Sequence, residues 1–160
     1  MAGHIIYTHS TIPAPPEAVW DVITDVTHAG EVFRSVSDAG DMSPGDFAVG
    51  SAWHERHDVF GHHDMEEMHV VECEQPRRAV VEAKAGADTI RTSYRLTPAD
   101  ERHASTRLAM TTFIEMKDRS TMSRAMWKVF GNLSFGHTRK VLEHDLEDIE
   151  AEAVRRSVPA

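Results

Sequence analysis

Residues 52–73 read AWHERHDVFGHHDMEEMHVVEC and are the most informative part of the chain. A glycine followed by a polar residue between two alternating runs is a turn signal, so Gly61-His62 predicts a β-hairpin here. This turn sets the facing pairs as Trp53 with Val70, Glu55 with Met68, His57 with Glu66, and Val59 with Asp64. The other face then pairs His54 with His69 and Arg56 with Glu67.

One face of this hairpin is expected to point into the protein. Side chains alternate along a strand, and the face that carries Trp53 and Val70 is the more apolar of the two. Glu55, His57 and Glu66 lie on that same face. Ionisable side chains within an apolar lining are typical of a cavity, so the pattern predicts a hollow interior.

The alternation continues from residue 51 to residue 117, with further turn signals at 75–78, 86–87 and 98–103. Each hairpin predicts which residues of the next strand share a face with Trp53. These are Val81, Ala83, Ala85, Ile90, Thr92, Tyr94, Leu96, Thr106, Leu108, Met110 and Thr112. The opposite face collects charged and hydroxyl side chains, so we expect one antiparallel sheet with a dry face and a wet face.

The segments on either side of these strands have a different pattern. His4–Ile12 predicts a first strand, Pro15 and Pro16 open a helix, and Thr27–Val36 predicts a second short helix. An edge strand is expected near Ser37–Asp41. The apolar spacing from Asp118 to Arg156 predicts one long C-terminal helix, in which Gly131 and Gly136 mark slack or a kink, and the acidic run Glu143–Glu152 is interpreted as a solvated face.

Composition narrows the function classes. The chain has 160 residues, which is one domain by length, and 17 basic against 26 acidic side chains give a net charge of −9. This charge argues against nucleic acid and anionic membrane surfaces as partners. No segment approaches the length of a membrane span, so insertion into a membrane is not expected. Met1–Ile12 lacks a signal-peptide pattern, so we expect a cytoplasmic location. The single Cys73 excludes an internal disulfide and a cysteine-based zinc site.

The order of elements, together with four phrases of sequence, resembles the START-like superfamily (SRPBCC, Bet v1-like), and within it the polyketide cyclase/dehydrase-type members. The phrases are IPAPPEAVWDV at 12–22, VGSAW at 49–53, VVECEQPRR at 70–78 and TSYRLTP at 92–98. The resemblance covers essentially the whole chain, 1–160, as a single ligand-binding domain. It implies an α+β helix-grip fold: a curved antiparallel sheet wrapped around a long C-terminal helix, with two short helices after the first strand.

The same resemblance implies that a small apolar or aromatic molecule binds between the sheet and the C-terminal helix. No cofactor is expected, and a homodimer is left open. The ligand-binding residues that we predict are Trp53, Met68, Val70, Ala83, Ile90, Thr92, Tyr94, Leu108, Met110, Met126, Phe130 and Leu133.

Three functions remain open from the sequence. The first is ligand binding without turnover. The second is a polyketide cyclase or aromatase-type enzyme, in which Glu55, His57 and Glu66 perform acid/base catalysis, with a His57–Glu66 pair that shares one proton near neutral pH. Tyr94 and Thr92 would then donate hydrogen bonds to an enolate oxygen. The third is a protein-interaction module.

A metal site is not expected. The chain has 11 histidines, but His54 and His57 point to opposite faces of a strand and cannot share an ion there. His54 and His69, as cross-strand neighbours on the outer face, would form at best an adventitious site.

Overall fold

The structure is a computed structural model that describes the backbone of residues 2–57, 65–85, 88–116 and 121–159. It describes the side chains of the same residues, apart from Ala2, Ala85, Met116 and 121–135. The elements, in chain order, are β1 (Ala2–Ile12), α1 (Pro16–Thr24), the 3₁₀ helix η1 (Val26–His28), α2 (Ala29–Val32), β2 (Val36–Gly40), β3 (Ala52–His57), β4 (Met65–Glu74), β5 (Arg78–Ala85), β6 (Asp88–Pro98), β7 (Thr106–Met116) and α3 (Thr121–Ser157).

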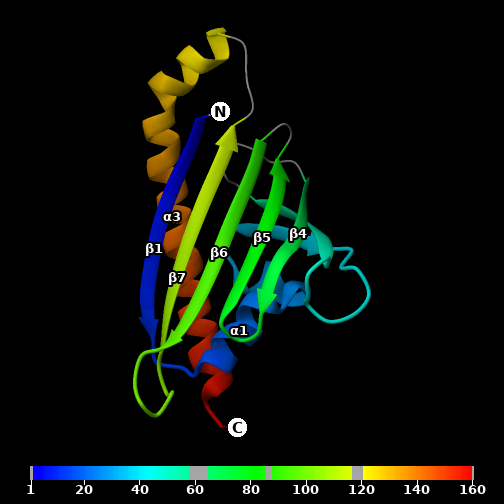
Figure 1. Ribbon diagram of the computed structural model, residues 1–160, viewed down its shortest axis with the longest axis vertical. Coiled ribbons are helices and arrows are strands. Elements are labelled where there is room, and N and C mark those ends of the chain that lie inside the picture. The colour runs from blue at the N-terminus through cyan, green and yellow to red at the C-terminus, as the bar shows by residue number, and fades with distance from the viewer. Residues whose placement is uncertain (1, 58–64, 86–87, 117–120, 160) are drawn as a thin grey trace.

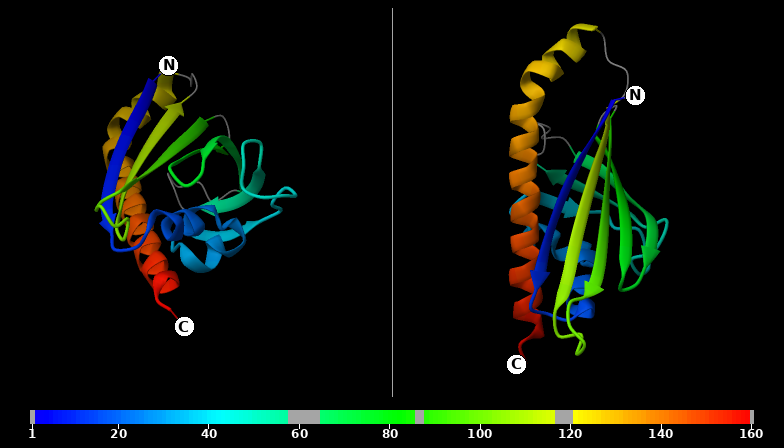
Figure 2. Two further views of the ribbon diagram at one scale, coloured as in Figure 1. Left: turned by 60° about the horizontal axis from the view of Figure 1, so that its bottom comes forward. Right: turned by 60° about the vertical axis from the view of Figure 1, so that its left-hand side comes forward.

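The strands form one antiparallel sheet in the order β1-β7-β6-β5-β4-β3-β2. Consecutive strands from β2 to β7 are neighbours, and the first strand closes onto the last. Figure 1 shows α3 running along one face of this sheet, and Figure 2 shows the sheet curving around the helix, with α1 beside the later turns of α3. This architecture confirms the predicted helix-grip α+β fold.

Local sequence explains how α1 begins. Pro15 is the N-terminal cap residue, with extended backbone, and Pro16 occupies the first helical turn. A proline there loses no hydrogen bond, because the first amide groups of a helix have no partner inside it. Glu17 adds a negative charge at the positive end of the helix dipole. The predicted second helix is shorter than expected, because it ends at Val32 and the chain is already extended at Phe33.

The hairpin of β3 and β4 has a different register from the predicted one. Trp53 faces Met68 and Glu55 faces Glu66, so the pairing is shifted by two residues from that expected. A shift of two leaves every side chain on its predicted face, because the period of a strand is two. The expected pair of Val59 with Asp64 and the turn at Gly61-His62 lie outside the described residues.

The remaining strands confirm the predicted faces. Met68 faces Ala83, Ala83 faces Ile90, and the ladder continues through Thr92 with Thr112 and Tyr94 with Met110. A bulge between Val70 and Glu72 bends β4 and reverses its alternation, so that beyond it Cys73, and not Glu72, lies on the inward face opposite Ala79. The long helix α3 continues past Gly136, one of the two glycines at which the sequence predicts slack or a kink.

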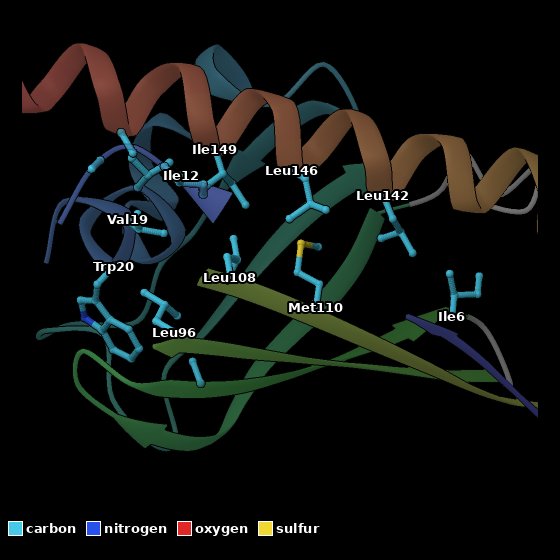
Figure 3. Close-up of a cluster of buried hydrophobic side chains, with 14 of the residues drawn as sticks. Ile6, Ile12, Val19, Trp20, Leu96, Leu108, Met110, Leu142, Leu146 and Ile149 are labelled. Atoms are coloured by element: carbon cyan, nitrogen blue, oxygen red, sulfur yellow. The ribbon is translucent and has the colours of Figure 1, made fainter. Parts of the chain in front are cut away.

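The packed core lies between α3, α1 and the strands β1, β6 and β7. Ile12 and Leu108 have no exposed surface, and Leu96 is 2% exposed. Figure 3 shows these side chains meeting Val19, Trp20 and the inward row of α3, namely Leu142, Leu146 and Ile149. Burial of this apolar surface is the main stabilising term for the fold. Among the described residues, no helix is long and apolar enough to cross a membrane, α3 included.

Candidate functional site

A cavity of about 120 Å³ lies between the inner face of the sheet, the segment from α1 to β2, and the later turns of α3. This volume is somewhat smaller than the roughly 150 Å³ of a dry cavity that binds one benzene ring. Most of its wall is apolar, formed by Ile23, Val26, Ala29, Phe33, Val36, Phe47, Trp53, Met68, Val81, Ala83, Ile90, Met110, Leu142 and Ile149. The remainder of the wall is polar and acidic.

The polar part of the wall centres on His57, whose two ring nitrogens both contact carboxylates. Nε2 lies 2.7 Å from Oε2 of Glu55, and Nδ1 lies 2.8 Å from Oε2 of Glu66. All three side chains are largely withdrawn from solvent, with 16% of His57, 9% of Glu55 and 4% of Glu66 exposed. The shifted register produces this arrangement, because it sets Glu55 opposite Glu66 and His57 two residues further along the same face. We call these three residues the acid-histidine cluster.

The two carboxylates hold His57 in its charged form. Burial alone would lower the pKa of His57, but the hydrogen bonds and negative charges of Glu55 and Glu66 outweigh it and raise the pKa from 6.5 to about 10. The sequence predicts a two-membered pair that shares a proton near neutral pH. The structure instead shows a three-membered cluster, in which His57 is an imidazolium across the neutral range.

The hydrogen bonds of the cluster are unevenly distributed. Trp53 Nε1 donates to Oε1 of Glu55 over 2.7 Å, so both oxygens of Glu55 have a partner. Oε1 of Glu66 is buried and has no hydrogen-bond partner within the described part of the chain. A buried carboxylate oxygen without a donor is costly, and Glu66 lines the cavity. Among the described residues, no donor therefore satisfies this oxygen.

A second acid reaches the cavity from α3. Asp145 accepts a 2.6 Å hydrogen bond from Oγ of Ser35, and both residues line the cavity. The neighbouring Arg34 donates to Oδ1 of Asp148 over 2.9 Å and forms a 2.9 Å ion pair with Glu147. The segment between α2 and β2 is thus fastened to the helix beside the site.

The environment of Asp145 favours its neutral form. Burial is the largest cause, and it raises the pKa from 3.8 to about 6. The Ser35 hydrogen bond and the charge of His57 oppose this shift, while the negative charges of Asp148 and Glu55 add to it. Asp145 is consequently an acid of this cavity whose protonation state changes close to neutral pH.

Hydroxyl groups complete the polar wall. Burial, and then the negative charges of Asp145 and Glu55, raise the pKa of Tyr94 well above its ordinary value of 10. Its phenol therefore stays protonated and can donate a hydrogen bond. Thr92 and Thr112 face one another across β6 and β7 with their hydroxyl oxygens 3.3 Å apart.

The structure places most of the predicted site residues in the cavity wall. These are Glu55, His57, Glu66, Trp53, Met68, Ala83, Ile90, Thr92, Tyr94 and Met110. Val70 and Leu108 are buried elsewhere: Val70 packs with Trp53 and Val81, and Leu108 packs in the core of Figure 3. The side chains of Met126, Phe130 and Leu133 lie outside those that the structure describes.

Sequence reasoning missed the contribution of α3 and of the segment before β2. Asp145 belongs to the acidic run Glu143–Glu152, which was interpreted as a solvated face, and that interpretation is wrong for this residue. Its spacing contained the signal, because Asp145 lies three residues after Leu142 and four before Ile149, on the same side of the helix. No sequence signal places Ser35 or Phe47 at the site, since their positions depend on how the loops fold over the cavity.

The expected pairing of the outer-face histidines also differs. His54 faces Glu67 and His69 faces Ala52, as a result of the two-residue shift. His69 Nε2 contacts Oε1 of Glu67 at 2.7 Å. Within the described ranges, no group of three or more histidine, cysteine or acidic side chains has the geometry to hold a metal ion.

The fold is shared with proteins of known structure. The protein TTHA0849 from Thermus thermophilus has a TM-score of 0.74 and 17% identity, and the match covers 97% of this chain and 100% of that one. The Zhui aromatase/cyclase from Streptomyces sp. R1128 has a TM-score of 0.71 and 18% identity, covering 97% and 96% of the two chains. A START superfamily protein from Mycobacterium smegmatis has a TM-score of 0.69 and 12% identity, covering 93% and 98%. At these identities the likeness shows the fold alone.

No curated protein matches the sequence. The family model described as polyketide cyclase / dehydrase and lipid transport matches residues 4–147, which span β1 through most of α3. With the helix-grip fold and the enclosed cavity, this match over most of the sequence shows that the chain belongs to the polyketide cyclase / dehydrase and lipid transport family.

Proposed function

We propose that this protein binds a small, mainly apolar or aromatic molecule in the cavity between the sheet and α3, with residues 1–160 acting as one ligand-binding domain. The observation that carries this proposal is the cavity itself, whose wall is apolar over most of its surface and acidic at one part. A few placed polar groups within an apolar lining are characteristic of small-molecule sites. Membership of a family described by cyclase, dehydrase and lipid transport functions supports the same conclusion.

The test is a native mass spectrum of the gently purified protein, combined with two matched variants. Ala83 lies in the cavity wall, whereas its neighbour Lys84 is exposed on the other face of β5. Ala83→Leu therefore places extra volume in the cavity, and Lys84→Leu places the same side chain outside it. We expect a bound apolar or aromatic compound in the parent protein and in Lys84→Leu, and its loss in Ala83→Leu. Equal occupancy in both variants would place the ligand elsewhere.

A second candidate is a polyketide cyclase or aromatase-type enzyme, and the observation that favours it is the acid-histidine cluster within reach of the same cavity. In this proposal Glu55, His57 and Glu66 form a charged wall in which His57 remains protonated. Asp145, whose pKa is about 6, is ionised at neutral pH and serves as the base that removes a proton beside a substrate carbonyl. Tyr94 donates a hydrogen bond to the enolate oxygen that forms, and protonated Asp145 then returns the proton to a departing hydroxyl, which leaves as water.

A pH–rate profile distinguishes this candidate from binding alone. Turnover of a poly-β-keto substrate should rise as pH increases through the pKa of Asp145, and Asp145→Asn should remove that limb. Asp21, an exposed acid on α1, provides the control in Asp21→Asn. If a bound carbonyl compound is recovered unchanged across this pH range, the protein is a binder without turnover.

A further inference from the structure

We propose that the ligand of this cavity carries a positively charged nitrogen, such as an ammonium group, which pairs with the carboxylates of Glu66 and Asp145 while an aromatic or apolar body contacts the rest of the wall. This inference rests on the proposed binding function and specifies its ligand class. Three independent features of the cavity support it.

The first feature is the balance of charge. Glu55, Glu66 and Asp145 line the cavity, and the only cationic side chain among the described lining residues is His57. A fourth acid, Asp25, is already neutralised from outside by Arg156 at 2.9 Å and by His28 at 2.9 Å. One imidazolium thus faces three carboxyl groups, and buried charges are stable only when they are paired. A cationic ligand supplies the missing charge.

The second feature is the balance of hydrogen bonds. The donors that contact the carboxylates are already committed: both nitrogens of His57 to Glu55 and Glu66, Trp53 to Glu55, and Ser35 to Asp145. The protonated phenol of Tyr94 is a further donor in the wall. The acceptor Oε1 of Glu66, by contrast, is buried without a partner in the described part of the chain. Glu66 as a whole is only 3% exposed, so solvent does not readily satisfy this oxygen. The carboxylate part of the wall therefore accepts hydrogen bonds, which favours a ligand with N–H groups at this part.

The third feature is the aromatic part of the wall. Phe47, Trp53 and Tyr94 all line the cavity, and the rings of Phe47 and Trp53 have centroids 6.0 Å apart. Aromatic faces attract cations through their quadrupole and also pack against a flat apolar body. An anionic ligand would be repelled by the carboxylates and would find no uncommitted cationic side chain among the described lining residues.

The experiment compares three probes that share one aromatic ring: benzylammonium, benzyl alcohol and benzoate. Each is titrated into the full-length protein near neutral pH, with heat of binding and tryptophan fluorescence as readouts, since Trp53 lies in the wall. We expect benzylammonium to bind about tenfold or more tightly than benzyl alcohol, as a charge-assisted hydrogen bond in a buried site allows, and benzoate to bind weakest. Benzyl alcohol or benzoate binding as tightly as benzylammonium would overturn the inference.

Variants assign the preference to the named carboxylates. Asp145→Asn keeps an acceptor for Ser35 and should reduce the preference for benzylammonium several-fold, while Asp21→Asn on α1 should leave it unchanged. Glu66→Gln should have the larger effect, but it removes a partner of His57, so its folding is verified by circular dichroism. If Glu66→Gln does not fold, Asp145→Asn and its control still decide. A preference that is unaltered in Asp145→Asn would refute the role given to this carboxylate.

The same titrations separate this inference from the function on which it rests. If none of the three probes binds the folded protein, the proposed binding function and the cationic ligand are both rejected. If the neutral probe binds in the parent protein and is lost in Ala83→Leu, but benzylammonium has no advantage, then the cavity binds ligands and only the cationic preference is rejected.

Discussion

The two parts of the interior use the same face of one sheet and are filled in opposite ways. Around Ile12, Leu96 and Leu108 the apolar side chains of α1, β6, β7 and α3 pack closely against one another (Figure 3). Around the acid-histidine cluster, the sheet and α3 enclose a cavity, and Oε1 of Glu66 has no partner among the described residues. The packed part therefore holds the fold together, while the hollow part maintains a polar arrangement at the expense of stability.

The largest effect is expected from a substitution that removes the cation of the acid-histidine cluster. His57→Gln leaves two buried carboxylates without their cation and should lower the free energy of unfolding by about 3–5 kcal/mol near neutral pH. The control His54→Gln lies on the same strand but on its other face, and should change stability by less than about 0.5 kcal/mol. Urea unfolding of both variants measures the difference. Equal losses in the two variants would mean that the carboxylates do not depend on His57.

The pH dependence of this difference has a definite sign. The folded pKa of His57, about 10, lies above its ordinary value of 6.5. Its stabilising contribution is therefore fully present below pH 6.5 and is lost as pH rises through 10. The gap in unfolding free energy between the parent protein and His57→Gln should consequently narrow between these values. A constant gap would contradict a raised pKa.

A core substitution probes the packed part. Leu108 is fully buried and does not line the cavity, so Leu108→Ala should cost about 3 kcal/mol through lost contacts and the void that remains. Arg107→Ala, one residue earlier and exposed, is the control. Ligand affinity should be preserved in Leu108→Ala at temperatures where it is folded. Loss of ligand binding with the fold intact would mean that the two parts of the interior are coupled.

Asp145→Asn should stabilise the protein, in contrast to the preceding changes. Because its folded pKa of about 6 exceeds the ordinary 3.8, Asp145 contributes stability that is lost as pH rises through 6. Above this pH, the free energy of unfolding of the variant should therefore exceed that of the parent protein by at most about 3 kcal/mol. Below pH 3.8 the two free energies should be equal. Asp21→Asn should show no such gain. Thermal unfolding at two pH values checks this, and a destabilised variant at high pH would contradict it.

The smallest effect is expected at the apolar wall of the cavity. Met68 lines the cavity and is only partly buried, so Met68→Ala removes less packed surface than Leu108→Ala and should cost about 1 kcal/mol. Its effect on ligand affinity should exceed its effect on stability, whereas Leu108→Ala should show the reverse. Urea unfolding and ligand titration of the two variants measure these effects, and equal ratios of affinity loss to stability loss would mean that the packed and hollow parts do not differ in this way.

The order of elements, the turns around Pro76 and between Pro98 and His103, and the inward faces of β3, β5, β6, β7 and of β4 as far as Val70 could be predicted from the sequence. These features depend on local turn chemistry and on a period of two along each strand. The presence of Glu55, His57 and Glu66 on one inward face follows from the same alternation. The apolar row on α3, formed by Leu142, Leu146 and Ile149, follows from helical spacing.

Only the tertiary structure decided the register of β3 and β4, and with it the contacts of His57. Alternation cannot distinguish two registers that differ by two residues, because both keep every side chain on its face, yet only the observed register sets Glu55 opposite Glu66. The positions of Ser35 and Asp145, and the assignment of Val70 and Leu108 to packed regions, depend on where the helices and loops settle against the sheet. The inward faces were thus determined by the sequence, whereas the chemistry of the cavity was determined by segments distant in sequence that meet only in the folded protein.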